Sequence, residues 1–151
     1  VDLIERRADG SALRVTDHKT GADRTPQDFI VAGGAILQPV LYSLAVERLL
    51  ELPVSEARLS FCTAAGGFSD RTLRIDSTVR RTAVQALELV DRAIASGMLA
   101  PAPRREQRNG REETACDTCE FHEVCGPHEP LRIQRKDPAL LSDLLRLRGL
   151  P

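Results

Sequence analysis

The order of apolar and polar positions along the 151 residues predicts alternating strands and helices. Residues 1–6 and 13–19 are two short strand-like runs, and the turn-forming run Ala8-Asp9-Gly10-Ser11 lies between them. This pattern predicts that the chain opens with a β-hairpin. Two further strands are predicted at residues 56–63 and 68–75, on either side of a glycine-containing turn.

Apolar residues with helical spacing predict one helix between the strand pairs and another after them. The first is expected over residues 36–51, because Pro39 is tolerated in the first turn of a helix. The second is expected over residues 78–96, with Gly97 as its stop signal. A polar, irregular arm and a short helix over residues 138–146 complete the prediction of an α/β domain with a mixed sheet.

Composition indicates a globular chain outside the membrane. Hydrophobic residues make up 42% and charged residues 28%, and no run of about 18 apolar residues is present to span a bilayer. The formal net charge of -1 excludes the large basic excess typical of many nucleic-acid-binding proteins, although a local site remains compatible with it. Of the 21 basic residues 19 are arginines, so Lys19 and Lys136 are informative wherever they fall in a chemical motif.

The first chemical feature is Asp17-x-Lys19 at the end of the second predicted strand. Residues i and i+2 of a strand point to the same face, so this carboxylate and ammonium project together. Antiparallel pairing of the hairpin places Asp2 opposite residues near Asp17, and two carboxylates with a lysine suit a Mg²⁺ site that acts on phosphates. The alternative is a surface salt bridge with little effect on stability.

The helix that follows carries Gln38 and Tyr42 one turn apart on one face. They either face the same site as Lys19 or form an ordinary helix surface with a half-buried tyrosine.

Asp2, Asp17-His18-Lys19-Thr20-Gly21 and Gln38-x3-Tyr42, followed by Cys116-x2-Cys119-x5-Cys125, together resemble the PD-(D/E)XK nuclease superfamily. The chain is most similar to RecB-type nuclease domains of bacterial helicase-nucleases, in the AddB-like branch with an iron-sulfur cluster. The resemblance implies a restriction-endonuclease-like core over residues 1–100. It also implies a cysteine-bearing arm with a terminal helix over residues 101–151, packed on the same domain.

The resemblance also implies roles for individual residues. Asp2, Asp17 and the backbone carbonyl of His18 would bind Mg²⁺ or Mn²⁺, and Lys19 would lie beside the attacking water. Gln38 and Tyr42 would orient Lys19 or contact the DNA backbone. The His18 side chain is expected on the opposite face, in a packing role. A helix with a further metal ligand would lie before Val1, so we expect a C-terminal fragment that could be inactive by itself.

The three clustered cysteines indicate a metal or cluster site in a reducing compartment. By the resemblance, Cys116, Cys119 and Cys125 would hold a [4Fe-4S] cluster whose fourth cysteine lies upstream. His122 or His128 could instead complete a zinc site with them. Cys62 is expected to be a buried strand cysteine. Three unrelated structural cysteines are the remaining interpretation.

The resemblance therefore implies a metal-dependent deoxyribonuclease domain, an exonuclease or endonuclease, that is cytoplasmic and nucleoid-associated in a bacterium. Its expected partners are DNA, especially single-stranded ends, and a helicase region or subunit for recombinational repair. The alternative is a catalytically inactive DNA-binding or scaffolding module of such a complex. Arginines 104, 105, 108 and 111 could contact phosphates, but interleaved glutamates favour a solvated loop.

Overall fold

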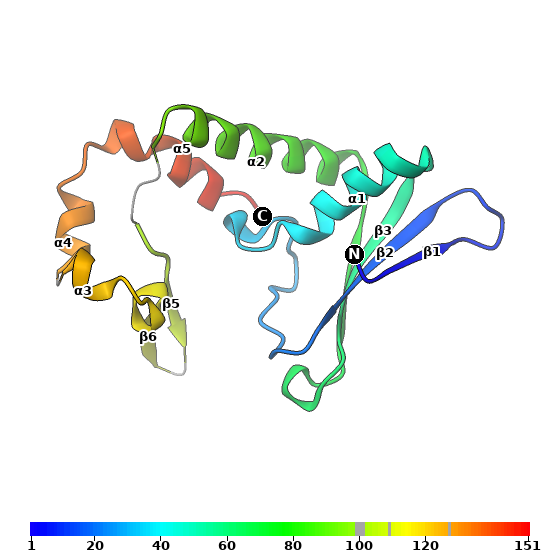
Figure 1. The fold of residues 1–151 in the computed structure, drawn as a ribbon, viewed down its shortest axis with the longest axis horizontal. Coiled ribbons are helices and arrows are strands. Elements are labelled where there is room, and N and C mark those ends of the chain that lie inside the picture. The colour runs from blue at the N-terminus through cyan, green and yellow to red at the C-terminus, as the bar shows by residue number, and fades with distance from the viewer. Residues whose placement is uncertain (99–101, 109, 127) are drawn as a thin grey trace. The chain divides into compact units, whose positions relative to one another are not determined.

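The structure is a computed structural model that describes residues 1–98, 102–108, 110–126 and 128–151. Contacts divide the chain into two compact units, the first made of Val1–Arg92 with Leu144–Pro151 and the second of Ala93–Asp143. The domain boundary predicted at residues 100 and 101 lies outside the described residues. In chain order the elements (Figure 1) are β1 (Leu3–Arg6), β2 (Leu13–Lys19), η1 (Ala32–Gly34), α1 (Gln38–Leu50), β3 (Val54–Phe61), η2 (Ala64–Gly66), β4 (Asp70–Arg74), α2 (Ser77–Ala95), β5 (Arg105–Arg108), β6 (Arg111–Thr114), η3 (Ala115–Thr118), α3 (His122–Cys125), α4 (Glu129–Gln134) and α5 (Pro138–Arg148).

Four strands of the first unit form a mixed sheet in the order β1-β2-β3-β4. The β1–β2 and β3–β4 pairs are antiparallel, and β2 pairs with β3 in parallel. A parallel pair requires a crossover connection, and α1 supplies it. The predicted α/β class, with a mixed sheet flanked by helices, is confirmed.

One face of the sheet forms the hydrophobic core with α1 and α2. Leu13 and Val15 of β2 alternate with polar residues, and helical spacing brings Val40 and Val46 of α1 against the same core. The other principal core residues are Phe29, Val31, Val54, Ala57, Leu59, Phe61, Leu73, Ile75, Val79, Ala83 and Ala86. None of the helices in the described part of the chain is long and apolar enough to cross a membrane.

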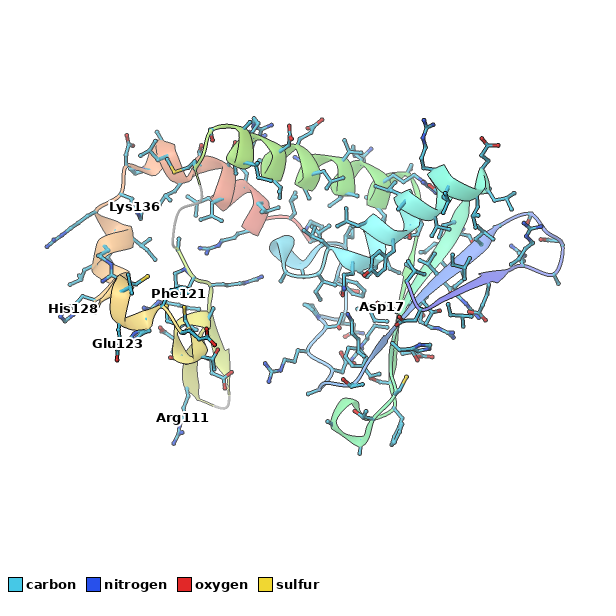
Figure 2. All side chains as sticks on the ribbon, viewed as in Figure 1. Asp17, Arg111, Phe121, Glu123, His128 and Lys136 are labelled. Atoms are coloured by element: carbon cyan, nitrogen blue, oxygen red, sulfur yellow. The ribbon has the colours of Figure 1, made fainter. Side chains whose placement is uncertain are left out.

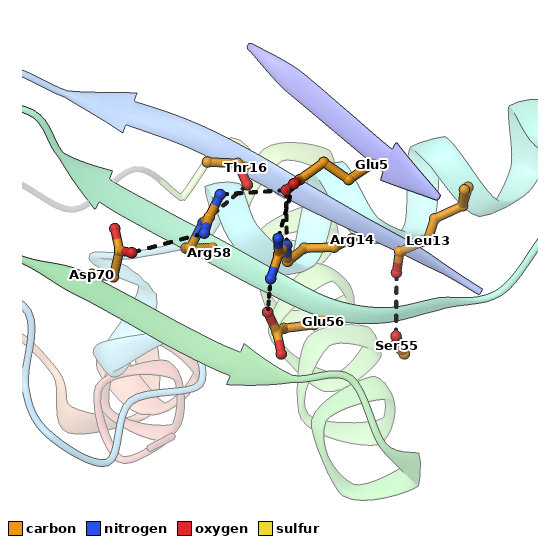
Figure 3. Close-up of polar contacts among 8 residues, drawn as sticks. All are labelled: Glu5, Leu13, Arg14, Thr16, Ser55, Glu56, Arg58 and Asp70. Atoms are coloured by element: carbon orange, nitrogen blue, oxygen red, sulfur yellow. Dashed lines mark hydrogen bonds and ion pairs between the residues drawn. The ribbon is translucent and has the colours of Figure 1, made fainter. Parts of the chain in front are cut away.

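The opposite face of the sheet carries a network of charged side chains (Figure 3). Arg14 on β2 donates from Nε to Glu5 on β1 at 2.8 Å and from Nη1 to Glu56 on β3 at 3.2 Å. Arg58 on β3 donates to Glu5 at 3.3 Å and lies 3.8 Å from Asp70 on β4. Side chains therefore connect all four strands on this face, in addition to the backbone ladder.

Helix α1 begins where the sequence predicts it to within two residues, and the segment before it is held by two backbone hydrogen bonds. Its first residue is Gln38, and Pro39 lies in the first turn as the sequence predicts. The preceding segment is held because the N–H groups of Val31 and Ala32 donate to the carbonyl of Pro151, at 2.6 and 3.0 Å.

The second unit contains a β-hairpin where the sequence predicts an irregular arm. Strands β5 and β6 pair antiparallel around a turn in which Gly110 has a φ of 75°. The prediction was wrong because the strands are rich in Arg and Glu and lack the apolar alternation by which a strand is recognised. An ion pair between Arg105 and Glu112 links the two strands. The predicted terminal helix is confirmed as α5, whereas the short helices α3 and α4 were not predicted.

Candidate active site

Asp17 and Lys19 lie on the same face at the carboxyl end of β2 (Figure 2 labels Asp17). The Asp17 side chain is 11% exposed, and its Oδ2 atom lies 2.5 Å from Nζ of Lys19. These atoms are within ion-pair distance but lack the angular geometry of a hydrogen bond, and Oδ2 accepts no hydrogen bond from any described residue. A buried carboxylate oxygen with this free coordination capacity fits a metal ion, because a buried anionic group is costly without further partners.

The ammonium of Lys19 is also bonded to the first residue of α1. Nζ of Lys19 donates to Oε1 of Gln38, and Nε2 of Gln38 donates to the hydroxyl of Tyr42 at 3.2 Å. Gln38 and Tyr42 are one helical turn apart, as predicted, and both take part in one chain of contacts that begins at Asp17. The Lys19 side chain is 31% exposed, so it is only partly enclosed by these contacts.

Asp2 lies immediately before β1 and reaches the same end of the sheet. Its backbone N–H donates to the carbonyl of Thr16 at 3.1 Å, which extends the predicted hairpin pairing to the level of Asp17. Its Oδ2 atom accepts the backbone N–H of His18 at 2.7 Å. That hydrogen bond lowers the pKa of the Asp2 carboxyl below its usual value, so the group is anionic at neutral pH.

The His18 side chain does not have the packing role expected from the sequence. It is 44% exposed, and Nδ1 lies 3.8 Å from Oδ2 of Asp2. His18 does lie on the face of β2 opposite Asp17 and Lys19, as expected, but its neighbours on that face include Arg14 and Thr16, and its ring lies near the Asp2 carboxylate and is not buried. The His18 carbonyl lies on the same side of β2 as its N–H, toward Asp2, because both groups of a strand residue point the same way.

Asp2 and Asp17 are the two carboxylates available for a metal ion at this end of the sheet. Over the described ranges, no group of three or more His, Cys, Asp or Glu side chains is placed to hold a metal ion. Mg²⁺ requires only one or two carboxylates, because water and substrate phosphate complete its octahedron. Asp2 and Asp17 therefore fit a hard divalent cation and do not fit zinc, which needs at least three protein ligands.

The cysteines of the tail lie in the second unit and are all free thiols. Cys116 is held in η3 by a capping box, in which Thr114 and Asp117 accept each other's backbone N–H groups. Cys116, Cys119 and His122 line one open depression of about 540 Å³, together with Asp117, Glu120 and Glu123. Cys125 and His128 are both exposed and do not line it. The structure therefore brings two of the three predicted cysteines to this depression.

Cys62 differs from its predicted environment. It is exposed, and its Sγ atom donates to the carbonyl of Ser60 at 3.3 Å. The prediction of a buried strand cysteine was wrong because β3 ends at Phe61, one residue earlier.

The sequence interpretation missed a buried acid beside the site. Asp23, in the loop after β2, has a side chain that is 9% exposed, and it accepts Nε of Arg71 at 2.6 Å and Oγ of Ser69 at 2.9 Å. No local pattern could identify it, because its partners lie more than forty residues away on another hairpin.

A mixed sheet with two acids, a lysine and a glutamine at one strand end has the form of a metal-dependent phosphodiesterase site. A family model of the PD-(D/E)XK nuclease superfamily matches residues 1–126. The chain belongs to this superfamily, whose members hydrolyse phosphodiester bonds and typically use divalent metal ions, with DNA as the substrate that the family implies. No curated protein gives a significant match to the chain.

Proposed function

We propose that the protein is a metal-dependent deoxyribonuclease whose site is built from Asp2, Asp17, Lys19, Gln38 and Tyr42. The observation that carries this proposal is the position of Lys19, whose ammonium lies between the buried carboxylate of Asp17 and the amide oxygen of Gln38. A lysine in a surface salt bridge would not need a second, neutral partner from a separate helix.

Asp17, Asp2 and the backbone carbonyl of His18 are the residues that would hold Mg²⁺ or Mn²⁺. The unbonded Oδ2 atom of Asp17 and the anionic state of Asp2 support this ligand set. When bound, such an ion lowers the pKa of a coordinated water and offsets charge on the scissile phosphate.

The chain's own residues supply orientation and charge. The Lys19 ammonium lies where it can orient the attacking water or neutralise a phosphate oxygen. Gln38 restricts the ammonium to one position, and the Tyr42 hydroxyl restricts Gln38 in turn. Tyr42 is half-buried, which limits the number of rotamers available to this chain of contacts.

The remaining parts of the proposal concern the tail and the biological setting. Cys116, Cys119 and Cys125 would bind a [4Fe-4S] cluster with a ligand from outside this set, and zinc is the alternative metal. Cys116 and Cys119 line one depression, which supports a shared ligand site, although no group of three His, Cys, Asp or Glu side chains among the described residues is placed to hold a metal ion there. The setting we propose is a bacterial helicase-nuclease that processes DNA ends in recombinational repair.

The test is cleavage of labelled single-stranded and duplex DNA with Mg²⁺ or Mn²⁺, compared between the wild-type protein and Lys19→Ala. We expect Lys19→Ala to lower the rate by at least about 100-fold, the usual effect of removing one charge-stabilising donor. The matched control is Lys136→Ala, because Lys136 is the other lysine of the chain and belongs to the second unit.

Equal rates for wild type and Lys19→Ala would exclude the catalytic assignment. Metal-independent DNA binding without cleavage by either protein would favour the alternative function, an inactive DNA-binding or scaffolding module. Thermal unfolding of both variants establishes that a lost rate does not reflect a lost fold.

A further inference from the structure

Two loops at the carboxyl end of β2 are fastened to each other beside the candidate active site. One is the segment 20–25 that follows Lys19, and the other is the connection 62–69 between β3 and β4, here called the hairpin tip. The N–H of Cys62 donates to the carbonyl of Lys19 at 2.9 Å, and Oγ1 of Thr63 donates to the carbonyl of Thr20 at 2.8 Å. The hairpin tip is therefore attached directly to the strand end that carries Lys19.

Asp23 completes this attachment. Its Oδ2 atom accepts Oγ of Ser69 at 2.9 Å and Nε of Arg71 at 2.6 Å, and Oδ1 accepts the N–H of Thr25 at 3.0 Å. Burial raises the pKa of the Asp23 carboxyl, but these hydrogen bonds more than offset that effect and the pKa lies below its usual value. The loops remain joined throughout the neutral range.

The hairpin tip presents Phe68 to solvent in an unfavourable backbone conformation. Its side chain is 73% exposed and its φ is 50°, directly after Gly67 with a φ of 68°. A bulky residue in the left-handed region is strained, and glycine or asparagine normally occupies such a position. Phe68 gains no compensating burial, so neither folding nor packing explains a phenyl ring here.

An unpaired positive charge lies in the neighbouring loop. Arg24 is exposed, and it has no hydrogen-bond or ion-pair partner in the part of the chain that the structure describes. Since Asp23 and Ser69 are hydrogen-bonded, their chain neighbours Arg24 and Phe68 flank that contact from the two loops. Arg24 and Phe68 therefore belong to the two loops that are attached to each other and to the strand end that carries Lys19.

We infer that Phe68 and Arg24 form a contact site for single-stranded DNA, in which a nucleobase stacks on the phenyl ring and Arg24 contacts an adjacent phosphate. Pairing of an exposed aromatic ring with a basic side chain is the arrangement by which proteins bind single strands independently of sequence. A base can reach the ring only when it is unstacked, so the site selects single-stranded ends over duplex. The inference rests on the proposed nuclease function and specifies which form of DNA it uses.

The test measures equilibrium binding of a fluorescent single-stranded oligonucleotide in EDTA, by anisotropy, so that cleavage plays no part. We expect Phe68→Ala to weaken binding by about 5- to 150-fold, the range for loss of one base–aromatic stack, and Phe68→Trp to retain it. An oligonucleotide of abasic sites should bind wild type and Phe68→Ala equally. The control is Phe121→Ala, because Phe121 is also exposed but belongs to the second unit.

Two further variants distinguish base stacking from an apolar protein contact and from a structural role of the phenyl ring. Phe68→Leu should bind DNA as weakly as Phe68→Ala, and retention of binding by Phe68→Leu would overturn the stacking role in favour of an apolar protein contact. Phe68→Asn suits the left-handed backbone, so it should unfold at the same or a higher temperature while losing DNA binding. A lowered unfolding temperature for Phe68→Asn would indicate a structural role and overturn the inference.

Arg24→Gln should weaken binding equally for normal and abasic DNA and reduce the slope of log K against log salt by about 0.7. Arg48→Gln is its control, because Arg48 is exposed at the far end of α1. Unchanged binding in both Phe68→Ala and Arg24→Gln would overturn the inference even if the wild type cleaves DNA. Loss of DNA binding in these two variants would uphold the inference. If Lys19→Ala also cleaved DNA as fast as wild type, that second result would exclude the catalytic assignment and leave the DNA-contact site in place.

Discussion

The ammonium of Lys19 depends on Gln38 for its position, because Asp17 alone does not give it hydrogen-bond geometry. We predict that Gln38→Ala lowers kcat by about 10- to 100-fold with little change in KM, since displacing a catalytic group by about 1 Å has an effect of this size. Steady-state cleavage of a labelled oligonucleotide measures both constants. A change confined to KM would show that Gln38 binds substrate and does not position Lys19.

Tyr42→Phe is the graded control for this prediction. The substitution removes the hydroxyl that accepts a hydrogen bond from Nε2 of Gln38, but it leaves the hydrogen bond between Lys19 and Gln38. Its effect on kcat should therefore be smaller than that of Gln38→Ala. An effect on kcat larger than that of Gln38→Ala would mean that Tyr42 itself contacts the reacting groups.

For individual residues, the sequence predicts which side chains share a face of one strand or helix better than it predicts the hydrogen-bond partners of a side chain. The i, i+2 spacing of Asp17 and Lys19 and the one-turn spacing of Gln38 and Tyr42 follow from strand and helix geometry alone. The bond from the His18 N–H to Asp2 depends on a side-chain rotamer at the sheet edge, which no periodicity encodes. The burial of Asp23 depends on a distant hairpin and could not be predicted for the same reason.

The side chain of Glu47 links three secondary-structure elements, α1, α2 and β3, by hydrogen bonds. Glu47 of α1 accepts Nη2 of Arg80 of α2 and the N–H of Val54 at the start of β3, both at 2.6 Å. We predict that Glu47→Gln lowers the free energy of unfolding at pH 7 by about 1–2 kcal/mol. This is the energy of a charge-assisted hydrogen bond, reduced because Arg80 is partly exposed and solvent screens its charge. Urea unfolding followed by circular dichroism measures this difference.

The same contact predicts a pH dependence. The hydrogen bond from Arg80 outweighs burial and lowers the pKa of Glu47 below its usual value of 4.5. A carboxyl whose pKa is lower in the folded than in the unfolded state stabilises the fold fully when the pH is above the unfolded-state pKa of 4.5. This stabilisation is lost as the pH falls through the folded-state pKa. The difference between wild type and Glu47→Gln should therefore be smaller at pH 4 than at pH 7. Glu88→Gln, at an exposed position of α2, is the control for the substitution itself.

The predicted elements succeed where a buried face imposes a period and fail where none exists. Strand β2 and helix α2 agree with the sequence prediction to within one residue at each end, because each has one face in the core. The sequences of β5 and β6 show no apolar alternation, and their charged composition is typical of a solvated loop. Their pairing follows from a turn at Gly110 and from charges on opposite strands, which a hydrophobic pattern does not contain.

For the whole molecule, the two units differ in how much apolar surface they bury. The core cluster lies in the first unit, whereas the buried hydrophobic residues described within residues 93–143 are Ala102 and Leu141. Several large apolar side chains of the second unit are exposed, namely Ile94, Phe121, Val124, Leu131 and Leu140. A unit with so little apolar burial requires another source of stability, and a metal or cluster bound by its cysteines can supply it.

We therefore predict that the second unit is ordered only when Cys116, Cys119 and Cys125 bind their metal or cluster. Because binding free energy becomes folding free energy at such sites, chelation or Cys116→Ser should accelerate proteolysis within residues 93–143 by about tenfold or more. Protein purified without oxygen should contain bound iron with visible absorption, or zinc without it, and Cys116→Ser should lose that metal. Cys62→Ser is the control, since Cys62 lies in the first unit and its loss should change neither readout. Equal protease resistance and no bound metal in wild type and Cys116→Ser would show that the hairpin and short helices are stable by themselves, and the cysteine motif would then have no ligand-binding role.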